Sequence, residues 1–179
     1  MPSGDVPRDA GAVRIRDAEP GDVTDVVALV ESAYRGPASR QGWTTEADLL
    51  DGQRTDAASV REVLPHLLVA RDEDQMVGCC TMIPREGFGY FGMFAVRPGL
   101  QGKGVGSELL AEAERRATTL GLGHVEMTVL SARTELLAFY RRRGYAETGE
   151  RRPFPYGDER FGRPRRDDLA FTVLVKQLA

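Results

Sequence analysis

A glycine-rich loop between an apolar strand and an amphipathic helix constrains this chain more than any other feature. The run RPGLQGKGVG over 97–106 contains four glycines and follows a strand predicted over 90–96 (YFGMFAV). Apolar side chains after the loop fall on one helical stripe: Val105, Leu109, Leu110, Ala113, Ala117 and Leu120. The N–H groups that begin a helix have no intrahelical partner, and glycines let a ligand approach them closely. The pattern therefore predicts an anion-binding site.

The spacing within this loop excludes two common phosphate-binding motifs. A Walker loop needs its lysine after the last glycine and before Ser or Thr, whereas Lys103 lies between Gly102 and Gly104. The dinucleotide fingerprint G-x-G-x-x-G fails because Ser107 stands in the third glycine position. Enzymes that bind ATP or NAD through these motifs are therefore disfavoured.

The rest of the chain predicts one mixed α/β domain. Strands are expected over 13–16, 66–71, 76–83, 90–96, 124–130, 145–150 and 169–176, and helices over 22–33, 45–64 (with a break near residue 52), 105–120 and 134–143. The length of 179 residues suits a single domain over 13–179, after a loose arm over 1–12 that is rich in Pro, Gly, Ser and Asp. The polar segment 151–168 is too long for a hairpin turn.

Composition argues against several other classes of protein. The net charge of −3 disfavours a protein that coats nucleic acid or anionic lipid. No apolar run approaches the ~18 residues that a membrane span needs, and the first residues do not resemble a secretory signal. Cys79 and Cys80 are adjacent within an apolar run and have no metal-ligand spacing, which indicates core residues. We therefore expect a cytoplasmic protein with no metal site.

Two motifs in the second half of the chain occur in an order typical of a known family. The loop matches Q/R-x-x-G-x-G/A through Gln101, Gly104 and Gly106, and the helix over 134–143 runs into FYRRRGY. With these motifs the chain resembles the GCN5-related N-acetyltransferase (GNAT) family over roughly 66–150. The resemblance implies a mostly antiparallel central sheet flanked by helices, with a splayed strand pair that holds the cofactor. It also implies an enzyme that transfers an acetyl group from acetyl-CoA to a primary amine by direct attack in a ternary complex.

The resemblance implies a cofactor site built from the loop and the strand before it. The amides of 101–107 would hold the pyrophosphate of CoA, and residues 94–96 would pair by backbone with pantetheine and polarise the thioester carbonyl. Arg133 stands where the family often has an asparagine that reaches the pantetheine, and would have to replace it. Arginines 141–143 are expected on a solvated face, with the adenosine phosphate as an alternative partner. The implied cofactor-binding residues are Phe94, Ala95, Val96, Gln101, Gly102, Lys103, Gly104, Val105, Gly106, Ser107, Arg133, Phe139 and Tyr140.

The resemblance specifies the catalytic residues less directly than the cofactor site. Tyr140 occupies the family position that often protonates the departing thiolate, although it could instead be an aromatic core residue. The strand over 90–96 has no carboxylate at the positions from which some members take a base. Glu126 lies opposite the apolar stripe of its strand and is the first candidate for the base, or else a cross-strand ion-pair partner. Asp158 and Glu159 are the second candidates.

The sequence leaves the acceptor open. Trp43 could line an acceptor pocket or anchor the core, and Tyr156, Asp158 and Glu159 could hold a cationic amine or simply belong to a surface loop. Two functions remain: an N-acetyltransferase, or a non-catalytic acyl-CoA sensor or interaction module of the same fold. Pairing of two copies through the last strands also stays open.

Overall fold

The computed structural model describes residues 12–35, 39–40 and 45–179. Trp43, and the predicted N-terminal arm except for its last residue, lie outside the described residues. The strands that the model describes are β1 (Arg14–Asp17), β2 (Leu50–Asp51), β3 (Leu67–Asp72), β4 (Gln75–Pro84), β5 (Phe88–Val96), β6 (His124–Leu130), β7 (Ala146–Pro153), β8 (Arg163–Pro164) and β9 (Ala170–Gln177). The described helices are α1 (Val23–Tyr34), α3 (Ala57–Val63), α4 (Val105–Thr119) and α5 (Thr134–Arg141), with the short 3-10 turns η1 (Pro20–Asp22), η2 (Leu64–His66) and η3 (Glu159–Phe161).

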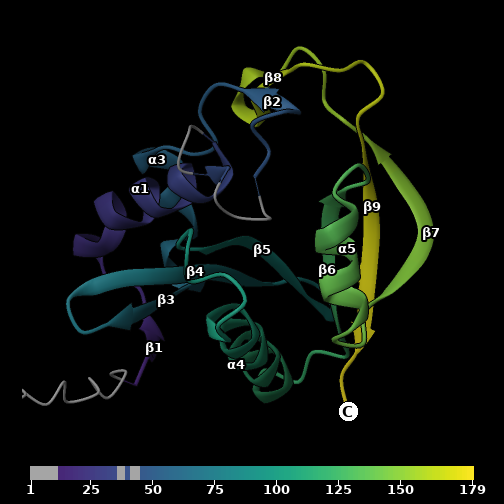
Figure 1. The fold of residues 1–179 in the computed structure, drawn as a ribbon. Helices are drawn as coiled ribbons and strands as arrows, with labels where there is room; N and C mark the ends of the chain where they lie inside the picture. The colour runs from purple at the N-terminus through teal and green to yellow at the C-terminus, as the bar shows by residue number, and fades with distance from the viewer. Residues whose placement is uncertain (1–11, 36–38, 41–44) are drawn as a thin grey trace, which may run out of the picture.

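A mixed sheet organises these elements (Figure 1). Among the described residues it has seven strands in the order β1-β3-β4-β5-β6-β9-β7. Every neighbouring pair is antiparallel except β5 and β6, which run parallel. The β5–β6 pairing covers only Phe88–Tyr90 opposite His124–Glu126, and the two strands diverge beyond it. The expected α/β class, with a mostly antiparallel sheet and a splayed strand pair, is confirmed.

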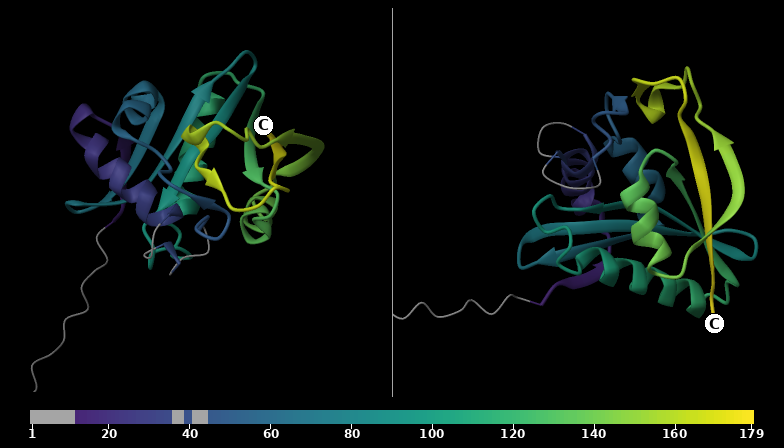
Figure 2. Two further views of the ribbon diagram at one scale, coloured as in Figure 1. Left: turned by 90° about the horizontal axis from the view of Figure 1, so that it is seen from above. Right: turned by 45° about the vertical axis from the view of Figure 1, so that its right-hand side comes forward.

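Helices cover both faces of the sheet. The stripe of α1 packs with Val69 and Cys79 on one face, where Val26 and Val30 are buried. On the other face, Leu109 and residues of α5 pack against β4, β5 and β6. Figure 2 shows α1 and α4 on opposite sides of the strands β3–β5. None of the helices in the described ranges is long and apolar enough to span a membrane.

The prediction of helix over 45–64 was wrong for residues 45–56. Leu50 and Asp51 form β2, which pairs with β8 from the long polar segment near the C-terminus. Gly52 follows at φ +84°, a backbone conformation that ends the strand and does not continue a helix. The helix α3 begins only after Asp56, whose side chain accepts a hydrogen bond from the Ser59 amide at 2.7 Å. The long segment 151–168 is thereby tied to the N-terminal half of the chain.

Asp22 provides a test of the packing at the start of α1. Its buried carboxylate accepts hydrogen bonds from Arg16 at 2.7 Å, Arg71 at 2.9 Å and the Glu19 amide at 2.8 Å. The Arg16 hydrogen bond holds the pKa of Asp22 far below its ordinary value, with smaller contributions from the Glu19 amide and Arg71. We expect Asp22→Asn to lower the free energy of unfolding at pH 7 by about 2 kcal/mol, measured by urea denaturation.

The pH dependence of this effect follows from the depressed pKa. The stabilisation is complete above the unfolded-state pKa of about 3.9 and is lost as the pH falls towards the native pKa. The difference between the wild type and Asp22→Asn should therefore shrink between pH 5 and about pH 2. A difference that stays constant over this range would show that the lost charge is not what destabilises the variant.

Candidate active site

A bulge in β5 opens the sheet where β5 and β6 part. Cys79 pairs with Ala95 and Thr81 with Gly92, so the register with β4 skips Met93 and Phe94. Met93 has φ +44°, which is unusual for a residue with a side chain and typical of such a bulge. The Phe94 carbonyl accepts a hydrogen bond from the hydroxyl of Tyr34 on α1. The bulge therefore places backbone groups of β5 beside the gap between the two strands.

The predicted glycine loop connects β5 to α4. Gly104 is the N-terminal flanking residue of α4 at φ +95°, and no side chain in the described part of the chain caps the helix, so the first amides of α4 keep their hydrogen-bonding capacity. The Gln101 amide group donates to the Val96 carbonyl at 3.1 Å, which fixes the loop against β5. A Cβ atom on Gly106 would lie 2.9 Å from the Phe94 ring, so the residue next to the helix start must be very small. The backbone of α4 at Gly106 therefore packs directly against Phe94 of β5.

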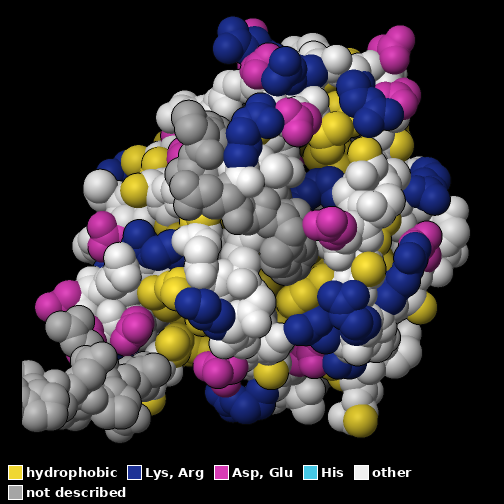
Figure 3. All heavy atoms as spheres, viewed as in Figure 1, with side chains coloured by type: hydrophobic (Ala, Val, Ile, Leu, Met, Phe, Trp, Pro, Cys, Tyr) yellow, Lys and Arg dark blue, Asp and Glu magenta, His cyan; other side chains and the backbone are white. Residues whose placement is uncertain are grey.

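A cavity of about 270 Å³ lies over this loop. Arg143 borders it, stacked with its guanidinium carbon 3.5 Å from the Phe139 ring centre and donating to Ser107 Oγ at 3.2 Å. Arg142 borders it as well, and Figure 3 shows Lys and Arg side chains gathered over the end of α5. The loop cavity is lined by Phe94, Val96, Gln101, Gly102, Gly104, Gly106, Ser107, Phe139, Arg142 and Arg143.

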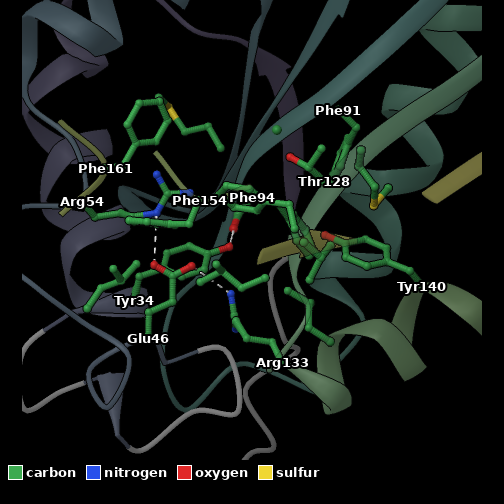
Figure 4. A pocket seen from close by; sticks show the side chains of 18 of the residues that line it. Tyr34, Glu46, Arg54, Phe91, Phe94, Thr128, Arg133, Tyr140, Phe154 and Phe161 are labelled. Carbon is green, nitrogen blue, oxygen red and sulfur yellow. Dashed lines mark hydrogen bonds and ion pairs between the residues drawn. The ribbon is translucent and has the colours of Figure 1, made fainter. Parts of the chain in front are cut away.

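A second cavity of about 260 Å³ lies between the diverging ends of β5 and β6 (Figure 4). Phe94, at the bulge, lines both cavities and is the point at which they adjoin. Here we call the second one the cleft cavity. It is lined by Tyr34, Arg35, Glu46, Leu50, Arg54, Tyr90, Phe91, Gly92, Met93, Phe94, Met127, Thr128, Val129, Leu130, Arg133, Leu136, Tyr140, Phe154, Phe161 and Phe171.

Tyr140 extends from α5 to the inner end of the cleft cavity. Its ring packs against Phe91, Phe94, Phe139 and Tyr145 at centroid distances of 5.2 to 6.3 Å. Burial raises the pKa of the Tyr140 phenol well above its ordinary value. The hydroxyl is therefore a proton donor that stays protonated at neutral pH.

An ionic group occupies the outer part of the cleft cavity. The buried Glu46 carboxylate lies 3.1 Å from Arg35, 3.3 Å from Arg133 and 3.5 Å from Arg54. Arg54 and Arg133 also lie over the ring of Tyr34, each 5.2 Å from its centroid. Burial acts to raise the pKa of Glu46, but the charges of Arg54, Arg133 and Arg35 outweigh burial and lower it. Glu46 is therefore ionised at neutral pH and is a weak base.

Several predicted site residues do not border either cavity. The Glu126 carboxylate forms an ion pair with Arg152 at 3.0 Å. Asp158 pairs with Arg160 at 2.6 Å, and the Tyr156 hydroxyl bonds the Arg166 carbonyl at 3.0 Å. Glu159 also lies outside both linings.

Five residues of the implied cofactor set lie elsewhere than in the loop cavity, among them Tyr140, which lines the cleft cavity. Lys103 is exposed, while Ala95 and Val105 are buried in the core. Arg133 lines the cleft cavity and contacts Glu46 there. In the described residues, no group of three or more His, Cys, Asp or Glu side chains could hold a metal ion.

The comparison with protein families decides the classification. A model described as the acetyltransferase (GNAT) family matches residues 25–145 of this chain. The chain belongs to the GNAT family. A search of curated proteins by sequence finds no significant match.

Solved structures share the GNAT fold over nearly the whole chain. One, assigned as a phosphinothricin N-acetyltransferase, is 22% identical with a TM-score of 0.68, covering 94% of this chain and 99% of that one. Ard1 from Thermoplasma volcanium is 16% identical with a TM-score of 0.69, covering 94% and 99%. A Mycobacterium tuberculosis protein solved with CoA is 21% identical with a TM-score of 0.65, covering 93% and 99%. At these identities the likeness is one of fold.

Sequence reasoning missed two parts of this site. The arginines at 142 and 143 were expected mainly on a solvated face, yet they border the loop cavity. Their position directly after the FY motif was the available signal. The group of Arg35, Glu46 and Arg54 gave no local signal, because these residues meet Arg133 only through folding.

Proposed function

We propose that this GNAT protein is an N-acetyltransferase, in which a single domain over 13–179 transfers the acetyl group of acetyl-CoA to a primary amine. One observation carries the proposal: the two cavities meet at Phe94, with the glycine loop on one side and Tyr140 on the other. A nucleotide held over the loop would reach the cleft through the gap between β5 and β6. The cleft cavity is then the place for the acetyl group and the amine.

The residues of the loop cavity fit CoA. The uncapped amides at the start of α4 suit the pyrophosphate, and the glycines at 102, 104 and 106 line the cavity without side chains. Arg142 and Arg143 suit the further phosphate of the nucleotide, because guanidinium groups bind phosphate oxygens in pairs. Bound acetyl-CoA supplies the thioester whose acetyl group is transferred.

The chain's own groups supply positioning, polarisation and a proton. Among the described residues, no strand pairs with β5 beyond Tyr90 on its β6 side, so its backbone there can pair with the pantetheine arm. A backbone N–H at the 93–94 bulge would donate to the carbonyl oxygen as negative charge develops on it. The Tyr140 hydroxyl would protonate the departing thiolate, and the proton that the attacking nitrogen loses as the amide forms would restore the phenol, directly or through water. Glu126 is held by Arg152 outside the cleft lining, and Glu46 is a weak base, so we propose that the amine attacks in its neutral form.

A thiol-release assay separates the enzyme from the acyl-CoA sensor. The protein is incubated with acetyl-CoA and a panel of primary amines, and free CoA is measured with a thiol reagent. The enzyme releases CoA in an amount equal to the acetylated amine found by mass spectrometry. Binding of acetyl-CoA without release above the hydrolysis background, over a broad panel, would favour the sensor.

A further inference from the structure

The charge of the cleft cavity is unbalanced. Of the described residues, its lining contains three arginines, Arg35, Arg54 and Arg133, against a single carboxylate, that of Glu46. The charge of Glu31 also acts on Arg54, but Glu31 lies outside the lining and accepts hydrogen bonds from the amides of residues 54 and 55, at 2.5 and 2.8 Å. The lining therefore has a surplus of two positive charges, which Glu31 offsets only in part. Because Arg35 and Arg133 are buried, such a surplus is costly unless an anion joins it.

The sequence of the neighbouring loop does not restore the balance. The residues between α1 and β2 that the structure does not describe, 36–38 and 41–44, contain no Asp or Glu. Of the described acids in this loop, Asp48 pairs with Arg40 at 2.8 Å. The compensating charge is therefore expected from a ligand.

Arg54 is the arginine best placed to meet that ligand. Arg35 and Arg133 have only 6% of their side-chain surface exposed, whereas Arg54 has 38%. Its Nε lies 3.5 Å from Glu46, and the structure gives its two terminal nitrogens no hydrogen bond to a described residue. In Figure 4 Arg54 lies between Glu46 and Phe161, at the outer part of the cleft cavity. Glu46 thus orients Arg54 while the planar end of the guanidinium stays available for two parallel bonds to an oxyanion.

The phosphates of CoA are not that anion. They belong to the loop cavity, which has its own arginines and adjoins the cleft cavity at Phe94. Pantetheine and the acetyl group, which would enter the cleft, are uncharged. The anion must therefore be part of the acceptor.

We propose that the acceptor is a small amine that carries an oxyanion, a carboxylate or a phosphonate-type group, bound by Arg54 at the outer part of the cleft cavity. This inference rests on the proposed function, because it names the substrate class of the same site. Phe154, Phe161 and Phe171 form an aromatic wall beside Arg54 and suit an apolar portion of the same molecule. The cavity of about 260 Å³ suits a molecule the size of an amino acid. Neither Asp158 nor Glu159 lines the cavity, so the proposal assigns the binding of a charged group on the acceptor to Arg54 and not to these two carboxylates.

The experiment compares matched amines on the whole protein. Acetylation is measured for L-methionine, L-phenylalanine and L-glutamate, each against its α-carboxamide, which keeps the amine and removes the anion. The aminophosphonic analogue of methionine shows whether the site takes carboxylate alone or either oxyanion. Arg54→Met removes the guanidinium, Arg54→Lys keeps the charge without the planar fork, and Arg160→Met is the control. Arg160 is 85% exposed, lies in the segment next to Phe161 and pairs with Asp158 outside the cavity.

The proposal predicts a specific pattern of rates. At least one acid should exceed its amide in kcat/KM by about 10-fold or more, because a charge-assisted pair replaces a neutral contact. Arg54→Met should lower kcat/KM for that acid by about 30-fold, mainly through KM, and for the amide by less than about 3-fold. The kcat/KM of Arg54→Lys for that acid should lie between the values of the wild type and Arg54→Met. The kcat/KM of Arg160→Met should match that of the wild type. Equal use of acids and amides, or an equal loss for both in Arg54→Met, would overturn the proposal.

A binding measurement separates this inference from the proposed function. Calorimetry follows the three amino acids and the aminophosphonic acid into the CoA-saturated protein. If no amine is acetylated, binding of an acid that is lost in Arg54→Met still supports the anion site, while absence of binding refutes it. Failure to bind acetyl-CoA refutes the proposed function instead. If the protein acetylates neutral or cationic amines in preference to amines that carry an oxyanion, the inference is refuted and the proposed function stands.

Discussion

Replacing Gly106 by glutamate is expected to lower the affinity for acetyl-CoA by about 100-fold or more. Gly106 lines the loop cavity, and a Cβ at this position would lie 2.9 Å from the Phe94 ring, so a long side chain is expected to extend into the cavity. Its carboxylate would lie where the pyrophosphate is proposed to bind and would repel it. A negative charge near the N-terminus of α4 is favourable for the helix, but the added Cβ requires the Phe94 ring to shift, so the fold of the variant must be checked. Isothermal titration calorimetry with acetyl-CoA measures the loss.

A matched variant controls for the added charge. Ala111→Glu introduces the same side chain at an exposed position of α4, outside the loop cavity. It should bind acetyl-CoA within about 3-fold of the wild type, because solvent and salt screen a charge at that distance. Equal affinities of the wild type and Gly106→Glu, with both proteins folded by circular dichroism, would place the cofactor elsewhere.

Removing the Tyr140 hydroxyl is expected to lower kcat by about 100-fold or more, the usual contribution of a general acid. Tyr140→Phe keeps the aromatic packing against Phe91 and Phe94, so folding and the affinity for acetyl-CoA should change little. The split between an intact Kd and a reduced kcat is the result that a purely structural role would not give. Steady-state thiol release together with calorimetry measures both.

The pH profile gives a second test of Tyr140. Because burial raises its pKa well above the ordinary value of 10, the phenol keeps its proton throughout the neutral range. The wild-type kcat should therefore not fall between pH 7 and about pH 9.5 through loss of this proton. A fall in kcat centred below pH 9 that disappears in Tyr140→Phe would contradict the high pKa.

The loop and its flanking elements were predictable because their physics is local. The helical stripe from Val105 to Ala117 and the glycines before it specify the strand-loop-helix unit without help from the rest of the chain. The strand over 124–130 was predicted with the bounds that the structure shows, since its alternation is unbroken.

The cleft cavity could not be predicted in the same way, because it forms only through contacts far apart in sequence. Glu46 meets Arg133 across 87 positions, and β2 pairs with β8 across more than 100. The helix predicted over 45–56 fails for the same reason: pairing with the C-terminal segment and the backbone of Gly52 override local propensity. Glu126 alternates as predicted, but its partner Arg152 on β7 could not be inferred from β6 alone.

The melting temperature of the protein with and without saturating acetyl-CoA tests the central claim most directly, with ATP and NAD as controls. A ligand that binds only the native state stabilises it, and saturation should raise the melting temperature by about 5 °C or more. The account predicts this rise with acetyl-CoA and none with NAD. Failure of acetyl-CoA to raise the melting temperature, or an equal rise with ATP, would contradict it and leave the glycine loop as a structural connection.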